Sequence, residues 1–504
     1  IIMQLDQLEP KCIWTEFFEI CKIPHGSGNV DALRTFLRKR AEERGFKCFE
    51  DGFAGNLLIV KEADHGFEHV PTICLQGHLD MVCSKRADCQ HDFLKDPIVP
   101  RITEVDGKQV VVATGTTLGA DDGMGLAAGL AFIFDKSNKC GRIEVLCTKD
   151  EETTMHGVHH MGNDFLKAKY LLNLDSEDVG VITIGSAGGF CGDVKFPVSE
   201  SVVTCPKEKC KLHLVKVFNC SGGHSGVDIH LYKANATKQL VRLLQLAVQY
   251  GAKLRCIKGG SAHNAIPMDA QASICFMDVD DSKIKEFNEK AKILAEEIKA
   301  EYKTTDANMQ ITVEQAECNC EVACHCLNDK ESRKMVNFLA NVPSQVLRMS
   351  QDVQGLTESS INMGTIKFCA KEGGLMTLLA RSSINSYLSA INNDVKSLCE
   401  LADYPYEGFR DAYGGWAPNP LSILLKATKK HYAAALGKKE EEIKIEAIHA
   451  GLECGELISK YPGLEAVSIG PTIKNPHSDR ELCEIATVAP FYECVKNVIL
   501  ELSK

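Results

Sequence analysis

The stretch VPTICLQGHLD, Val70 to Asp80, decides how this chain folds. A short apolar run that ends in polar residues is typical of a buried strand. His78 and Asp80 stand where this strand is expected to end. Open α/β sheets bind their ligands at the carboxyl ends of the strands. The two side chains are therefore candidates for a functional site.

Three further segments deliver acidic side chains in the same way. The segment GRIEVLCTK is followed by Glu151 and Glu152, and the segment AKYLLNLD ends at Asp175. A helix of small residues opens with Asp121. Alone, each of these acids is typical of a turn or a helix cap. Because four consecutive segments deliver such a residue at the same end, we expect one shared site, to which the distant His477 folds back.

These side chains can bind two divalent metal ions. Zinc and similar ions take imidazole nitrogen and carboxylate oxygen as ligands, and two neighbouring ions need a bridging carboxylate plus about two further ligands each. The count is met by His78, Asp121, Glu152, Asp175 and His477. Asp80 can accept the second ring N–H of His78 and fix its orientation. In extended backbone Glu151 points away from Glu152, which leaves it free to act as a general base.

The pattern of expected elements changes twice along the chain. Residues 1–187 alternate strands and helices and predict the first part of an α/β catalytic domain, with a mixed sheet flanked by helices. Residues 188–405 show hairpin strands and amphipathic helices, which predict an inserted α+β lid domain, compatible with two similar halves. The α/β pattern resumes in residues 406–504, the second part of the catalytic domain.

Length and charge narrow the class of protein. A chain of 504 residues is too long for one hydrophobic core, and 44% hydrophobic and 25% charged residues are ordinary for a soluble protein. The net charge of −11 argues against a nucleic-acid partner. We find neither a membrane-spanning apolar run nor an N-terminal signal. A cytoplasmic protein that acts on small molecules is therefore expected, with no membrane partner.

The 23 cysteines stand mostly singly within apolar segments, which is typical of reduced, core-packing thiols. One cluster differs. The stretch ECNCEVACHC contains Cys318, Cys320, Cys324 and Cys326, which would share one face of an unbroken strand and could form a zinc or redox site. Because the tight spacing of zinc knuckles is missing, we prefer a strand that packs one cysteine-rich face on the core.

Five motifs in order resemble those of the M20 metallopeptidases with cocatalytic metals: GHLD, LGADDGMG, DEET, NLDSED and NPHSDRE. The resemblance is closest to the aminoacyl-histidine dipeptidase branch, also called peptidase D or cytosol nonspecific dipeptidase. It covers the whole chain and includes SGGHSG, HNAIP and ARSS in the region of the expected lid. The resemblance implies a zinc-peptidase-like catalytic domain.

The same resemblance implies how the metal ligands are shared. Asp121 would bridge two divalent ions, most simply zinc, with manganese or cobalt as alternatives. His78 and Asp175 would hold one ion, and Glu152 and His477 the other. The choice of Asp121 rests on this analogy, because Asp122 follows it directly.

The resemblance also implies the reaction: hydrolysis of unblocked dipeptides, including Xaa-His, by attack of a metal-bound hydroxide. Glu151 would be the general base and Asp80 the orienting carboxylate. In the lid, His224 would stabilise the oxyanion. Asn264 and Arg381 would bind the substrate, with Arg381 suited to its carboxylate.

Several alternatives stay open. The same metal ligands serve N-acyl amino acid deacylases and carboxypeptidases, and a non-enzymatic scaffold is disfavoured because none of the expected ligands is missing. His156, His159 and His160 follow the expected base and could compete as ligands, although we interpret them as loop or helix-surface residues. The oligomeric state is not determined by the sequence, and a homodimer is compatible with it.

Overall fold

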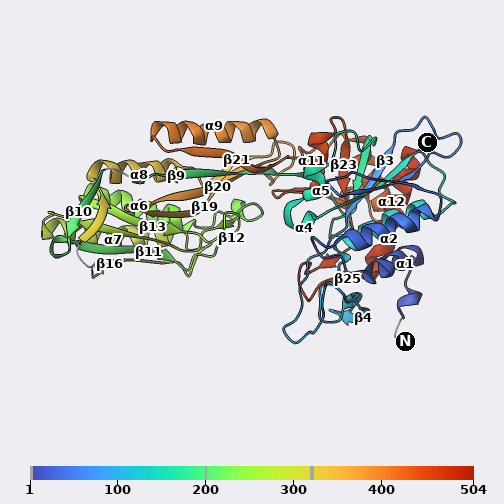
Figure 1. Ribbon diagram of the computed structural model, residues 1–504, viewed down its shortest axis with the longest axis horizontal. Helices are drawn as coiled ribbons and strands as arrows, with labels where there is room; N and C mark the ends of the chain where they lie inside the picture. The colour runs from blue at the N-terminus through green and yellow to red at the C-terminus, as the bar shows by residue number, and fades with distance from the viewer. Residues whose placement is uncertain (1–3, 199–200, 318–322) are drawn as a thin grey trace. The chain divides into compact units, whose positions relative to one another are not determined.

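The structure is a computed structural model that describes residues 4–198, 201–317 and 323–504. The chain divides into two compact units. Unit 1 comprises Ile1–Ser186, Trp416–Ala447 and Leu452–Lys504, and unit 2 comprises Ala187–Gly415 and Ile448–Gly451. Each unit has its own sheet, helices and hydrophobic core (Figure 1).

An eight-stranded mixed sheet forms the centre of unit 1. In spatial order its strands are β1 (Lys47–Glu50), β2 (Leu57–Lys61), β6 (Ile143–Thr148), β3 (Ile73–His78), β7 (Tyr170–Asn173), β23 (Glu465–Ser468), β8 (Val181–Ser186) and β22 (Lys444–Ile448). The pairs β6–β3, β3–β7 and β7–β23 are parallel. Strands β2, β3 and β6 are buried along their whole length, as expected for strands covered on both faces.

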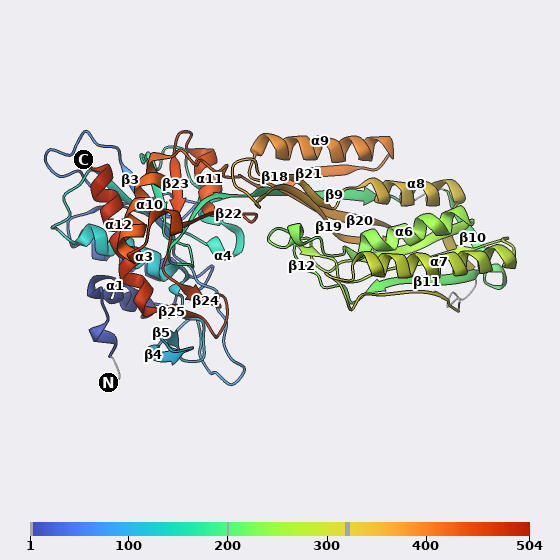
Figure 2. The same cartoon turned by 180° about the vertical axis from the view of Figure 1, so that it is seen from behind.

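Helices cover this sheet. They are α2 (Asp31–Glu42), α3 (Ala120–Phe134), α10 (Ile423–Leu436), α11 (Glu453–Lys460) and α12 (Ile485–Leu502), and α1 (Lys11–Cys21) packs on α3. Helix α3 packs on β3 and β6, α2 on β1 and β2, and α10 on β23 and α12 (Figure 2). All residues of α3 from Ala120 to Ile133 are buried, and after Asp121 and Asp122 the helix is apolar on every side.

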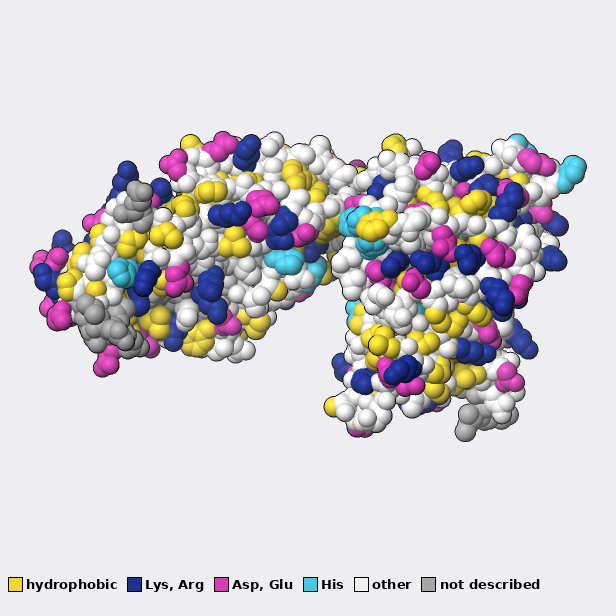
Figure 3. Space-filling model, viewed as in Figure 1, with side chains coloured by type: hydrophobic (Ala, Val, Ile, Leu, Met, Phe, Trp, Pro, Cys, Tyr) yellow, Lys and Arg dark blue, Asp and Glu magenta, His cyan; other side chains and the backbone are white. Residues whose placement is uncertain are grey.

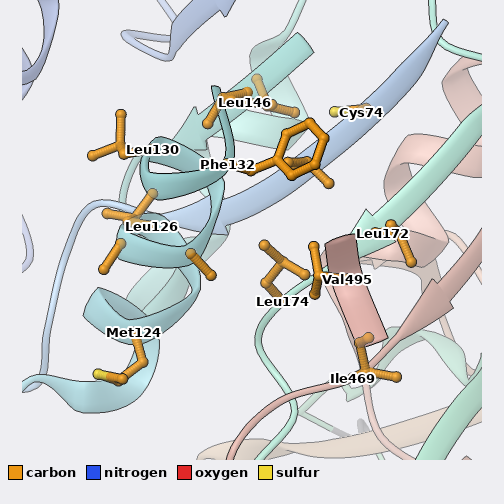
Figure 4. Close-up of a cluster of buried hydrophobic side chains, with 14 of the residues drawn as sticks. Cys74, Met124, Leu126, Leu130, Phe132, Leu146, Leu172, Leu174, Ile469 and Val495 are labelled. Carbon is orange, nitrogen blue, oxygen red and sulfur yellow. The ribbon is translucent and has the colours of Figure 1, made fainter. Parts of the chain in front are cut away.

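The core of unit 1 lies where α3 meets the parallel strands. Figure 4 shows Leu126, Leu130 and Phe132 of α3 near Leu146 of β6 and Cys74 of β3. These five side chains are at most 1% exposed. The helix is therefore held firmly against the strands whose ends carry the predicted site residues.

A second, four-stranded sheet in unit 1 carries His477. Its strands are β24 (Ile473–Lys474), β25 (Leu482–Glu484), β5 (Lys108–Ala113) and β4 (Pro100–Val105). His477 lies in the loop between β24 and β25, with a positive φ of 60°. Because β25 pairs with β5, this late segment of the chain is anchored to the N-terminal part of unit 1.

Unit 2 contains a nine-stranded antiparallel sheet built of two similar halves. The first half has the order β16 (Gln310–Gln315), β11 (Lys211–Phe218), β15 (Ala270–Phe276), β13 (Ala252–Gly259), and the second follows as β19 (Thr357–Cys369), β20 (Gly373–Ser382), β9 (Gly188–Phe196), β21 (Tyr406–Tyr413). Numbered along the chain, each half reads 4-1-3-2 from its outer edge, the order of a ferredoxin-like unit. Strand β18 (Gln345–Met349) pairs additionally with β19.

Four helices pack on the sheet of unit 2: α6 (Ala236–Gln249), α7 (Asp281–Glu301), α8 (Asp329–Asn341) and α9 (Asn385–Leu401). The Asn235 side chain caps α6 by accepting the N–H groups of Thr237 and Lys238. Helix α6 packs on β11, β13 and β15, and α9 on β20, β9 and β21. The two shortest ribbons are β10 (Val202–Pro206) with β17 (Ala323–Leu327), and β12 (Gly223–His224) with β14 (Ala265–Ile266).

The boundaries between the units differ in two places from the expected domains. One is the short segment Ile448–Gly451, which belongs to unit 2 although it lies within the expected second part of the catalytic domain. The chain enters unit 2 after Ser186, beside the expected boundary at 187/188. It returns to unit 1 after Gly415 rather than after 405, because β21 pairs with β9 and so extends the sheet of unit 2.

Of the cysteine cluster in ECNCEVACHC, Cys318 and Cys320 lie outside the described residues.

The visible surface mixes charges of both signs. Figure 3 shows Lys and Arg side chains interspersed with Asp and Glu side chains on the viewed face of each unit. Among the helices of the described residues, none combines the length and the apolar character that a membrane span requires.

Close packing of α3 leads to a first prediction. A methyl group at Gly125 would lie 2.7 Å from the Leu174 carbonyl oxygen and would also meet the Asp122 carboxylate. We expect Gly125→Ala to lower the free energy of unfolding by about 1–3 kcal/mol, because backbone must shift. Gly129→Ala is the matched control, since its methyl would meet only side chains, the nearest atom being Val145 Cγ1 at 3.1 Å. Equal unfolding midpoints in urea for the two variants would contradict this packing.

Candidate metal centre

The parallel strands of unit 1 bring the predicted site residues to one edge of the sheet. His78 at the end of β3 pairs in register with Thr148 at the end of β6, and Gln76 of β3 pairs with Asn173 at the end of β7. The residues that follow β6 and β7 therefore leave the sheet beside His78. This is where an open α/β sheet places its ligand site.

Asp121 lies between two histidines. Its Oδ1 is 3.0 Å from His78 Nε2, and its Oδ2 is 3.1 Å from His477 Nε2. The carboxylate therefore presents one oxygen to each imidazole. His78 is 1% and Asp121 9% exposed, whereas about half of the His477 side chain is exposed. The site is thus closed on the side of the sheet and open on the side of the His477 loop.

Each histidine has a second acidic neighbour. Asp175 Oδ1 lies 3.4 Å from His78 Nε2, and Glu152 Oε2 lies 3.0 Å from His477 Nε2. Two groups result in which nitrogen and oxygen atoms lie within 4.8 Å of one another: His78, Asp121 and Asp175, and Asp121, Glu152 and His477. Both groups contain Asp121. The five residues expected as metal ligands are thus gathered as two triads that share one carboxylate.

Asp122 is oriented differently from Asp121. Its Oδ2 accepts the backbone N–H of His78 at 3.2 Å, and its Oδ1 accepts that of Gly125 at 3.1 Å. Its carboxylate thus serves the backbone of β3 and α3. Of the two neighbouring acids, Asp121 is the one that faces both histidines.

Glu151 and Glu152 do not lie in extended backbone, and that expectation is wrong. They form the first turn of a short helix, α4 (Glu151–Thr154). The Asp80 carboxylate accepts the backbone N–H groups of Glu151 and Glu152, at 2.9 and 3.3 Å. These are donors that a helix leaves unpaired at its first turn. As a result both glutamates stand beside His78, with ligand atoms within 4.8 Å of one another.

Asp80 orients His78 chiefly through its backbone. His78 Nδ1 is 2.8 Å from the Asp80 carbonyl oxygen and 3.6 Å from the carboxylate. The carboxylate also accepts the hydroxyl of Ser27 at 2.7 Å. Asp80 therefore ties the end of β3 to α4, and the His78 ring keeps Nε2 directed toward Asp121.

The charge balance of the site fits a bound cation. Burial raises the pKa of Asp175 well above its usual value, and burial raises the pKa of Glu151 to about 8. Hydrogen bonds to Asp121 and Glu152 raise the pKa of His477 to about 11. In the site without a metal ion, protons on these side chains therefore supply part of the positive charge that the clustered carboxylates require. Glu152 Oε1 is buried without a hydrogen-bond partner among the described residues. This oxygen is therefore able to coordinate a metal ion.

Glu481 holds the backbone around Asp121, a role that the sequence did not reveal. Its carboxylate accepts the N–H groups of Leu118, Gly119, Ala120 and Asp121, at 2.7, 3.0, 2.8 and 3.3 Å. Glu481 is 2% exposed, and burial raises its pKa to about 7. One buried carboxylate therefore fixes the segment that carries Asp121. The motif NPHSDRE contained this residue, but only the fold shows its partners.

Glu453 is a second buried acid that sequence reasoning missed. Its Oε2 accepts hydrogen bonds from Gln76 Nε2 at 2.6 Å and Thr148 Oγ1 at 2.7 Å. Asn173 Nδ2 donates in turn to Gln76 Oε1 at 2.6 Å. This network joins the ends of β3, β6 and β7 just behind His78. Burial raises the pKa of Glu453 to about 8.

In unit 2 the structure brings together two of the three residues expected to bind substrate. Arg381 is 5% exposed, and its guanidinium donates to the Tyr413 hydroxyl at 2.7 Å and lies 3.5 Å from His224 Nε2. Asn264 is exposed and precedes β14, which pairs with the strand of His224. The backbone carbonyl of Asn264 accepts the N–H of Ser225 at 2.9 Å.

The three histidines that follow α4 lie on α5 (His156–His160). His156 Nε2 lies 3.2 Å from the Phe53 carbonyl oxygen, and His160 Nδ1 lies 3.0 Å from the His156 carbonyl oxygen. His159 lies 3.5 Å from Glu456. Within the described residues, none of them joins a candidate metal group.

Comparisons with known proteins identify the fold. No protein-family model matches the chain. An M20 family metallo-carboxypeptidase from Sulfolobus solfataricus superposes with a TM-score of 0.51 at 14% identity, over 97% of this chain and 98% of that one. Aminoacylhistidine dipeptidase from Vibrio alginolyticus superposes with a TM-score of 0.88 at 35% identity, over 99% and 98%. The fold is that of the M20 peptidases, and the predicted α/β fold class is confirmed.

The family follows from sequence identity. The chain is 35% identical over 500 residues to the cytosol non-specific dipeptidase of Escherichia coli strain K12, covering 99% of each protein. It belongs to the family of this dipeptidase. The resemblance inferred from the five motifs is thereby confirmed.

The role of Glu481 can be tested by metal affinity. In Glu481→Gln the amide offers one acceptor oxygen to four N–H groups, so the Asp121 segment should loosen. We expect divalent ions to bind about 10–100-fold more weakly, the loss typical of a residue that orients a ligand. The measurement is competition with a chromophoric chelator. The control is Glu484→Gln, which changes another buried carboxylate, one that pairs with the exposed Lys108 and Lys474 and not with the Asp121 segment; equal affinities for the two variants would contradict the role of Glu481.

Proposed function

We propose that the chain is a metal-dependent dipeptidase that hydrolyses unblocked dipeptides, including Xaa-His. The observation that carries this proposal is Asp121, whose two oxygens face two different histidines. A carboxylate shared by two ligand triads is what a pair of neighbouring divalent ions requires. Membership in the cytosol non-specific dipeptidase family supports the choice of substrate.

The proposed ligands divide as the two triads do. His78 and Asp175 would hold one ion, Glu152 and His477 the other, and Asp121 would bridge them. Zinc suits this mixture of imidazole and carboxylate, and manganese or cobalt suits it as well. When bound, the ions would act as Lewis acids and lower the pKa of a water molecule in the site.

Glu151 is proposed to move the proton. It is not needed as a ligand, yet its carboxylate lies within 4.8 Å of ligand atoms of His78 and Glu152. It can take a proton from the attacking water and return it to the leaving amine. Its raised pKa of about 8, caused first by burial, suits a group that must both accept and donate.

His224 is proposed to donate to the oxyanion. Its Nδ1 accepts the backbone N–H groups of Gly226 and Val227, at 3.2 and 3.1 Å. Burial and nearby Arg381 lower its pKa, which favours the neutral ring. A neutral imidazole that accepts at Nδ1 carries its proton on Nε2. That N–H is therefore available to stabilise negative charge on a substrate oxygen.

Arg381 is proposed to bind the dipeptide carboxylate, and Asn264 to contact the substrate backbone. Arg381 Nε is buried and has no hydrogen-bond partner among the described residues. A guanidinium with an unsatisfied donor is suited to bind a carboxylate. Unit 2 would thus act as the substrate-binding lid. We place the enzyme in the cytoplasm by analogy with its relative's name.

A substrate panel tests the function. The metal-reconstituted full chain is given Xaa-His and other dipeptides, a tripeptide and N-acetyl amino acids. We expect cleavage of the dipeptides alone, abolished by a chelator and restored by zinc or manganese. Cleavage of acetylated compounds alone would assign a deacylase instead, and cleavage of the tripeptide from its C-terminus a carboxypeptidase.

Glu151→Gln separates proton transfer from metal binding. The variant should retain the metal content of the unchanged chain and lose turnover by about 10²–10⁴-fold, because a positioned general base is gone. Glu152→Gln is the matched comparison, since it removes a proposed ligand and should lower metal content. Metal content is read by atomic emission and turnover with an Xaa-His dipeptide. A fully metallated Glu151→Gln variant with unchanged turnover would exclude Glu151 as the base.

A further inference from the structure

Five cysteines of unit 2 meet where the β10–β17 ribbon lies near the large sheet. Strand β17 runs close to β13 of that sheet. Cys205 of β10 and Cys324 of β17 are paired in register, Cys210 directly precedes β11, and Cys275 lies on β15. We call this the sulfur cluster: Cys205, Cys210, Cys275, Cys324 and Cys326.

The sulfur atoms of the cluster face one another. Cys210 Sγ lies 3.0 Å and Cys205 Sγ 3.7 Å from Cys275 Sγ. All three lie within 4.8 Å of one another, as a metal ion would require. Cys275 also interacts with the thiol of Cys326, and Cys210 with that of Cys324. Cys324 and Cys326 each contact one of the central three, although neither belongs to the group within 4.8 Å, so one of them would have to move closer to become the fourth ligand.

These distances match a metal-thiolate site better than a disulfide. A disulfide joins two sulfurs at about 2.05 Å, and it would engage only one pair. Around a tetrahedral zinc ion with Zn–S bonds of about 2.3 Å, sulfurs lie about 3.8 Å apart. The 3.7 Å between the sulfurs of Cys205 and Cys275 is close to that value. The 3.0 Å between those of Cys210 and Cys275 is shorter, so the half-buried Cys210 side chain would have to turn away from Cys275 to bind the ion.

The surroundings fit a closed, structural site. Cys205 is 1% exposed, and Cys275, Cys324 and Cys326 are 0% exposed. Structural zinc sites are four-coordinate and shielded from water, whereas catalytic sites keep a position open. Their neighbours Val203 and Met277 are apolar. Such a site provides soft sulfur ligands and excludes hard ions that prefer oxygen.

We propose that the sulfur cluster binds one thiophilic divalent ion, zinc above all, through Cys205, Cys210, Cys275 and one of the two cysteines of β17. The ion would join the β10–β17 ribbon to β11 and β15 of the nine-stranded sheet. This site is separate from the carboxylate and imidazole centre of unit 1, so the proposal does not depend on the proposed function.

Binding has a chemical consequence that can be followed. Burial raises the pKa of the Cys205 thiol to about 11, and burial also raises the pKa of Cys210. The metal-free thiols are therefore protonated at neutral pH, and the ion must displace those protons to form thiolate bonds. Affinity should accordingly increase with pH.

The test is optical titration of the full chain with Cd²⁺ or Co²⁺. The protein is first freed of metal and kept reduced. Thiolate ligands give ultraviolet charge-transfer absorption with these ions, and the imidazole and carboxylate ligands of unit 1 do not. We expect this absorption to saturate at one ion per chain, and Zn²⁺ to abolish it by displacement.

Two variants assign the signal. Cys210→Ser replaces a half-buried ligand, so the fold should persist while the absorption falls to a small fraction at the same metal concentration. The matched control is Cys256→Ser. Cys256 also contacts another thiol, that of Cys369 at 2.8 Å, but this pair belongs to no candidate metal group among the described residues. The control should keep the full signal.

Two results would overturn the proposal. The first is no charge-transfer absorption from the unchanged chain while a thiol assay shows its cysteines reduced. The second is an absorption that Cys210→Ser leaves unchanged or that Cys256→Ser removes. Circular dichroism of both variants shows whether a lost signal comes from the ligand or from unfolding, and the first result needs no variant.

Discussion

The crowding of buried carboxylates at the ends of β3, β6 and β7 is the constraint on which unit 1 depends. Burial raises the pKa of Asp122 and Asp175 well above their usual range, because it removes water from the charged form, and the negative charges of neighbouring carboxylates raise it further. Asp121 is the exception. Burial alone would raise its pKa, but hydrogen bonds from His477 and His78 outweigh burial and lower it. A cation bound by these residues would neutralise part of their negative charge, and it could activate a water molecule in the site.

The fold meets this constraint by giving each acid a distinct set of partners. Glu481 accepts four backbone N–H groups before α3, Asp80 accepts those at the start of α4, and Glu453 accepts Gln76 and Thr148. Buried charges are tolerated when hydrogen bonds satisfy them. Glu481, Asp80 and Glu453 do not belong to the ligand triads. Their hydrogen bonds fix the backbone and side chains around the acids that do belong to them.

The sequence predicted the parts of this arrangement that depend on strand order. Parallel strands end at the same edge, so His78 of β3, Glu152 after β6 and Asp175 after β7 could be expected together. The sequence did not predict the helical start at Glu151, because the donor groups of α4 are satisfied by Asp80, far away along the chain. The role of Glu481 could not be predicted for the same reason, because the N–H groups that it accepts, around Asp121, are far away along the chain. Cys205, Cys210 and Cys275 likewise meet only in the folded chain, whereas ECNCEVACHC stood out as a local pattern.

The central claim is that Asp121 bridges two metal ions. Anomalous X-ray diffraction from crystals of the zinc-loaded chain tests it most directly. The account predicts two anomalous peaks about 3.5–4 Å apart, one beside His78 and Asp175 and the other beside Glu152 and His477, with one Asp121 oxygen on each. A single peak, or two peaks of which only one contacts Asp121, would contradict it.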